Sequence, residues 1–234
     1  MYRNELPLIY ELRDMLPDPI PASAYFQNLD KSLSDSQQKL RQYRDLEQDL
    51  AGLDAAAWGF LKSEVKPLLM VRHEKRGWHQ LFDKLNQAKG YNHLKRAGYE
   101  AVSFIPPVPG CMTPDLEARS GTSRVLCEVK TINVSDVEAH RRFFGGVGSV
   151  DDQLQAGFFA KLSSDLAKAQ AQMAAFDAGP TVRKLAYVVI NFDDSLHEYA
   201  DRYEEQITRY VADHPTHGLE VGFYWKPPFG SATI

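Results

Sequence analysis

The stretch Thr113–Asn133, TPDLEARSGTSRVLCEVKTIN, constrains the fold more than any other part of this 234-residue chain. It has a short polar segment around Gly121, with strand-forming residues such as Val, Leu and Ile close by. Glycine supplies the positive φ that a tight turn between two strands needs. The pattern predicts a β-hairpin with strands at Met112–Ala118 and Arg124–Ile132, joined by a turn through 119–123.

Three acidic side chains and one lysine are expected to face the same way in this hairpin. Successive side chains of a strand point to opposite faces. Asp115 and Glu117 therefore share one face of the first strand, and Glu128 and Lys130 share one face of the second. Hairpin pairing brings the two strands to about 5 Å apart. Apolar residues flank these charges, so we expect a convergent polar cluster and not a simply solvated face.

This arrangement resembles the signature of the PD-(D/E)xK nuclease superfamily, which has the restriction-endonuclease-like fold. Pro114-Asp115 matches the PD element, and Glu128-Val129-Lys130 follows after a gap of twelve residues as the ExK element. The resemblance covers roughly residues 76–193. It implies an α/β fold in which helices flank a central mixed β-sheet, with the core order helix–strand–strand–strand–helix–strand.

The same resemblance implies a metal site that cuts phosphodiester bonds. Asp115, Glu128 and the backbone carbonyl of Val129 would bind Mg²⁺ or Mn²⁺, and Glu117 is a further candidate ligand. Hard divalent cations prefer oxygen ligands, and they both activate water and offset charge on phosphate. Lys130 would orient the attacking water or help to deprotonate it. The expected partner is nucleic acid, with DNA favoured.

Further candidates for binding nucleic acid follow the hairpin. Lys168 and Gln172 lie one turn apart on a helix predicted over Phe158–Phe176, and members of the superfamily often place a glutamine near the cleft here. Arg141 and Arg142 belong to a glycine-containing loop that is expected to lie over the cleft.

Many members of the superfamily carry a further glutamate on the first core helix. That helix is predicted over Arg76–Ala97, and the corresponding positions hold Asp83, Asn86 or Gln87. Whether this helix supplies a third acid stays open.

The rest of the chain divides into a helical N-terminal extension, 1–70, and the nuclease-like domain, 71–234. Residues 1–33 show little regular pattern. Apolar spacing predicts a helical hairpin within 34–70, either packed on the core or forming a homodimer contact. The other predicted elements are helices from Asp35 and over Asp54–Glu64 and His197–Ala212, and strands over Tyr99–Ile105, Leu185–Phe192 and Leu219–Trp225.

Composition narrows the class of protein without deciding the function. The net charge of −4 excludes a surface coated in basic residues, but local charge decides whether phosphate binds. Two cysteines are too few for a disulfide framework, and no apolar run has the length of a membrane span, so we expect a cytoplasmic protein. Two alternatives to a nuclease remain: a member of the fold that binds nucleic acid or protein without cutting, and an unrelated α/β domain with a surface ion-pair ladder.

Overall fold

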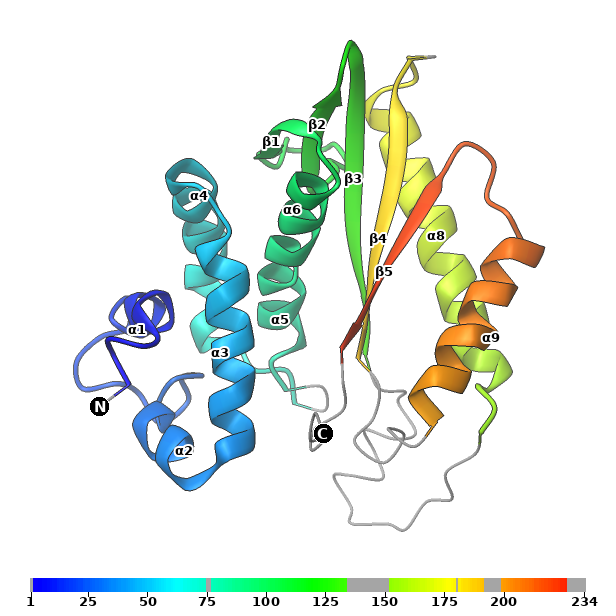
Figure 1. Cartoon of the computed structure of the whole chain (residues 1–234). Coiled ribbons are helices and arrows are strands. Elements are labelled where there is room, and N and C mark those ends of the chain that lie inside the picture. Colours follow the sequence, from blue (N-terminus) through cyan, green and yellow to red (C-terminus); the bar gives the residue numbers. More distant parts are fainter. Residues whose placement is uncertain (1, 75–76, 134–151, 180, 192–198, 227–234) are drawn as a thin grey trace. The chain divides into compact units, whose positions relative to one another are not determined.

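The computed structural model describes residues 2–74, 77–133, 152–179, 181–191 and 199–226 (Figure 1). The chain separates into two compact units, Met1–His93 and Leu94–Ile234. The domain boundary at residue 70 that the sequence suggests stays a prediction.

The first unit is helical. Two of its helices start at side-chain caps: Ser36 accepts a hydrogen bond from the Lys39 amide at 3.2 Å, and Asp54 accepts one from the Ala57 amide at 2.9 Å. The elements are α1 (Pro7–Arg13), α2 (Leu29–Asp35), α3 (Gln37–Ala51), α4 (Ala55–Val65), the 3₁₀ turn η1 (Lys66–Met70), α5 (His79–Leu85) and α6 (Gln87–Arg96), the last of which runs into the second unit.

Two sequence-based expectations for these helices were wrong. Residues 1–33 contain α1 and most of α2, and Pro7 begins α1 because a proline at the first helical position loses no hydrogen bond. The single helix predicted over Arg76–Ala97 is two helices. The chain breaks at the buried Asn86, whereas Gly90, the suspected point of interruption, lies inside α6.

The second unit is built on a five-stranded mixed sheet, in the order β1 to β5 (Figure 1). The first three strands are antiparallel, and β3, β4 and β5 run parallel. An α/β fold with a mixed sheet is therefore confirmed. The strands are β1 (Glu100–Phe104), β2 (Leu116–Ser120), β3 (Ser123–Ile132), β4 (Arg183–Asn191) and β5 (Glu220–Lys226), and the helices are α8 (Ala156–Phe176) and α9 (Ala200–Asp213).

Helices α8 and α9 pack on one face of the parallel strands. Parallel strands need a long crossover connection, and α8 supplies it between β3 and β4. No helix in the described part of the chain, the 21-residue α8 included, is long and apolar enough to cross a membrane. The buried side chains of this layer are Leu126, Ile132, Leu162, Leu166, Ala169, Met173, Ala186, Val188, Ile190, Tyr203 and Ile207.

The central hairpin forms, but with a tighter turn than the sequence suggested. Strand β2 begins at Leu116, four residues later than predicted, just after Pro114, which lacks the N–H that a ladder needs. It continues to Ser120, which pairs with Ser123 across a two-residue loop. Gly121 has φ +58°, and Thr122 has no positive φ, as in a type II′ turn.

Replacing Gly121 should therefore destabilise the second unit. In Gly121→Ala, an alanine must adopt the positive φ of this position, which costs roughly 1–2 kcal/mol. Gly157→Ala is the matched control, because Gly157 lies in the first turn of α8 with open space around it, and this change should leave the stability unchanged or raise it slightly. Urea denaturation measures both. Equal changes in the two variants would contradict the assigned turn.

Candidate active site

Asp115 and Glu128 face each other at the end of the β2–β3 ladder. The register pairs Leu116 with Cys127, so Asp115, one residue earlier, lies opposite Glu128. The Asp115 Oδ2 atom accepts a hydrogen bond of 2.9 Å from the Val129 amide, which fixes this carboxylate against β3. Glu128 is only 4% exposed. Two predicted acids are thus brought together from adjacent strands.

Both carboxylate oxygens of Glu128 have partners. Lys130 Nζ donates to Oε1 at 2.6 Å, as expected for residues two apart on one face of a strand. Gln172 Nε2 donates to Oε2 at 3.0 Å and also to the carbonyl of Thr113 at 2.7 Å. Gln172 therefore ties α8 to β3 and to the segment that leads into β2, at the point where the two acids meet.

The setting of Glu128 disfavours its charged form. Burial, and next the negative charge of Asp115, raise the pKa of Glu128 to about 7, although Lys130 opposes this shift. At neutral pH the carboxyl group is therefore divided between its protonated and ionised forms. A proton or a bound cation would each relieve the repulsion between the two acids.

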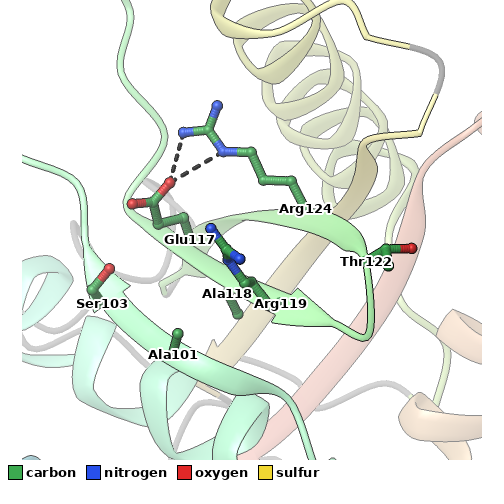
Figure 2. A pocket seen from close by; sticks show the side chains of 7 residues that line it. All are labelled: Ala101, Ser103, Glu117, Ala118, Arg119, Thr122 and Arg124. Carbon is green, nitrogen blue, oxygen red and sulfur yellow. Dashed lines mark hydrogen bonds and ion pairs between the residues drawn. The ribbon is translucent and has the colours of Figure 1, made fainter.

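Glu117, the further candidate ligand, has another partner. Its Oε2 accepts hydrogen bonds from Arg124 at 2.6 and 3.1 Å, and Figure 2 shows the pair. Arg124 also donates to Asp177, just after α8, at 2.8 Å. The carboxylate of Glu117 is thus held by an arginine. Of the three acids, Asp115 and Glu128 are therefore the candidate ligands for a cation.

The oxygen donors at this point suit a hard divalent cation. In antiparallel pairing, the N–H and C=O of one residue face the same neighbouring strand. The Val129 N–H points to Asp115, so the Val129 carbonyl lies on that side too. Mg²⁺ commonly binds one or two carboxylates and keeps several waters. Within the described ranges no three His, Cys, Asp or Glu side chains form a metal-binding group, so this pair would rely on such waters.

Helix α8 presents a polar stripe to which Gln172 belongs. Lys168, one turn earlier, is exposed. Asp165, which the sequence analysis missed, is 4% exposed, and both of its oxygens lie 2.5 Å from Lys161 Nζ. The spacing of residues 161, 165, 168 and 172 places all four on one side of the helix. This spacing was the feature of the sequence that could have identified Asp165.

The remaining candidates stay predictions. Arg141 and Arg142 lie outside the described residues. Asp83, Asn86 and Gln87 belong to the first unit, whereas the residues described above belong to the second.

The chain has no match among protein-family models, curated protein sequences or solved structures. The functional assignment therefore rests on the geometry of the site.

The raised pKa of Glu128 predicts a pH dependence of stability. Because the folded-state pKa of about 7 exceeds the ordinary value of 4.5, protonation favours the folded state. This contribution is complete below about pH 4.5 and is lost as the pH rises through 7. Relative to Glu128→Gln, the wild type should lose on the order of 3 kcal/mol of unfolding free energy between pH 4.5 and 8.

Urea denaturation in EDTA at a series of pH values measures this difference. Glu204→Gln, which changes an exposed glutamate of α9, is the control and should follow the wild type. Parallel pH profiles for the wild type and Glu128→Gln would contradict the assigned pKa.

Proposed function

We propose that this protein is a Mg²⁺- or Mn²⁺-dependent nuclease that hydrolyses phosphodiester bonds of nucleic acid, with DNA favoured. One observation carries the proposal. The buried Glu128 lies opposite Asp115, with Lys130 in hydrogen-bond contact, at the end of one hairpin. This arrangement of the three side chains supports the resemblance of the sequence to a PD…ExK site.

The residues have distinct roles in this proposal. Asp115, Glu128 and the Val129 carbonyl would hold the cation, which supplies Lewis acidity and an activated water when bound. Lys130 places a positive charge beside the phosphate and positions the attacking water. Gln172 holds Glu128 in place by its amide, since it also bonds the Thr113 carbonyl.

A second candidate is binding of nucleic acid without cleavage. It is favoured by the ion pair of Lys130 with Glu128, which together with Gln172 occupies both oxygens of this carboxylate. If this ion pair persists when nucleic acid binds, the site has a structural role and no cation enters it.

A cleavage assay separates the two candidates. Single-stranded, double-stranded and branched DNA, and RNA of matched sequence, are incubated with Mg²⁺, Mn²⁺ or EDTA. Metal-dependent cutting that Asp115→Ala abolishes supports the nuclease. Binding of the same substrates without cutting supports the second candidate.

Metal binding at this site should stabilise the wild type and not Asp115→Asn. A ligand present at 100 times its Kd adds about 2.7 kcal/mol, which for a chain of this size raises the Tm by about 5–10 °C. Differential scanning fluorimetry with Mg²⁺ and Mn²⁺ measures the shift. Asp213→Asn, an exposed aspartate at the end of α9, is the matched control and should respond as the wild type does. An undiminished shift in Asp115→Asn would remove this site from consideration.

Lys130→Ala should separate catalysis from metal binding. The lysine supplies no metal ligand, so the Tm shift with Mg²⁺ should persist. Loss of one preorganised electrostatic contact typically lowers a rate on the order of 10²–10³-fold, and the cleavage rate should fall by this factor. The metal-dependent Tm shift doubles as the check that the variant is folded. Cutting at the wild-type rate would show that Lys130 is only a charge on the strand.

A further inference from the structure

A hollow of about 400 Å³ opens over β1, β2 and β3, beside the candidate active site. Figure 2 shows the side chains that line it, which come from all three strands and the hairpin turn. Its volume lies in the range of roughly 300–1,000 Å³ that is common for small-molecule sites. The polar lining residues are Ser103, Glu117, Arg119, Thr122 and Arg124.

The hollow shares one sheet face with the acid pair. Residues directly opposite in antiparallel strands point to the same face, and the register pairs Arg119 with Arg124 and Ser103 with Glu117. Alternation along β2 then places Asp115, Glu117 and Arg119 in one row. At roughly 3.4 Å per residue, the Arg119 backbone lies about 14 Å from that of Asp115.

The backbone of β1 is distorted where it lines the hollow. Ala101 has φ +49°, a conformation that costs a non-glycine residue roughly 1–2 kcal/mol. The register between β1 and β2 shifts between Glu100 and Ser103. Such bulges re-aim side chains and are common beside binding sites. Ala101 and Ser103 both line the hollow.

Of the two arginines that line the hollow, Arg124 is held in ion pairs and Arg119, among the described residues, is not. Arg124 is neutralised by Glu117 and Asp177. Within the described part of the chain, the side chains of Arg119, Ser103 and Thr122 make no hydrogen bond or ion pair. The hollow therefore offers an exposed planar cation, which lies across the strand pair from the exposed Glu100 and makes no ion pair with it, and two hydroxyl groups. Arginine, serine and threonine are among the side chains that bind phosphate oxygens of nucleic acid.

We propose that this hollow binds one phosphate group of the nucleic acid, with Arg119 as its principal contact. The role in substrate binding rests on the proposed function, whereas phosphate binding itself does not. At about 3.4 Å of axial rise per nucleotide, the subsite lies up to about four nucleotides from the bond that is cut. The phosphate is either internal to the strand or a phosphomonoester at its end.

The test measures binding of short single-stranded DNA in EDTA, so that no cleavage occurs. Fluorescence anisotropy over a series of salt concentrations compares the wild type, Arg119→Ala, Arg119→Lys and Arg209→Ala. Arg209, an exposed arginine of α9 paired with Glu205, is the matched control. Arg119→Ala should weaken binding about tenfold and reduce the salt slope by about 0.7, the value for one phosphate contact in a single strand. Arg119→Lys should retain the slope and part of the affinity.

The DNA is used with hydroxyl ends and with a phosphate at the 5′ or 3′ end. An effect of Arg119→Ala that is equal for all three shows that the hollow takes an internal phosphate, and one confined to a phosphorylated end shows a terminal phosphate. Either result supports the proposal. Affinity and salt slope equal to those of Arg209→Ala would overturn it, as would absence of binding by the wild type. Arg119-dependent binding in EDTA, combined with no cutting in the separate assay with Mg²⁺ or Mn²⁺, would contradict the nuclease but keep the phosphate site.

Discussion

The pairing of β2 with β3 holds the buried carboxyl group of Glu128 against that of Asp115, and the site depends on this burial and on the repulsion between the two groups. Burial, and next the charge of Asp115, displace the pKa of Glu128 from 4.5 to about 7, which corresponds to about 3 kcal/mol, unfavourable to the charged form. The unfolding free energy of a folded protein is roughly 5–15 kcal/mol, so this cost is a large part of it. Glutamine at the same position would avoid the cost. Strong perturbation of this kind favours a functional over a structural role for the pair.

The apolar layer that packs against this face of the sheet keeps Glu128 close to Asp115. On the face of β3 that carries Glu128, the neighbours Leu126 and Ile132 belong to the apolar core between the sheet and helices α8 and α9. Because this core fixes the position of α8, the side chain of Gln172 reaches both Glu128 and the Thr113 carbonyl. Moving the acid away from Asp115 would therefore disturb packed side chains as well as two hydrogen bonds.

Local rules were enough to place the central residues. The two-residue period of a strand puts Glu128 and Lys130 on the same face as Leu126, and the structure agrees. The predictions that failed concern features that depend on residues distant in sequence. Helix α1 has no cap of its own. The amides of Leu8 and Ile9 donate to the buried Glu47, which is 39 and 38 residues away.

The ion pair of Glu117 with Arg124 also could not be predicted from the sequence, for the same reason. Alternation alone places its carboxylate on the face of the acid pair, where it looks like a third ligand. Its partner Arg124 is seven residues away in sequence, across the hairpin, and is oriented by Asp177, which is 53 residues from it. Only the tertiary structure brings that second acid to the arginine. Sequence periodicity therefore fixes the face of a side chain but not its partner.

The order of charges along this face also bears on how a substrate would lie. Because β2 and β3 run in opposite directions, Arg119 and Arg124 are at one end of the ladder and Lys130 is beyond the acid pair at the other. Along this row, cations therefore lie on both sides of the two carboxylates. The net charge of −4 says nothing of this order. If the acids hold a divalent cation, as proposed, it would offset their charge, and the exposed end of the row at Arg119 would then attract the phosphates of a substrate.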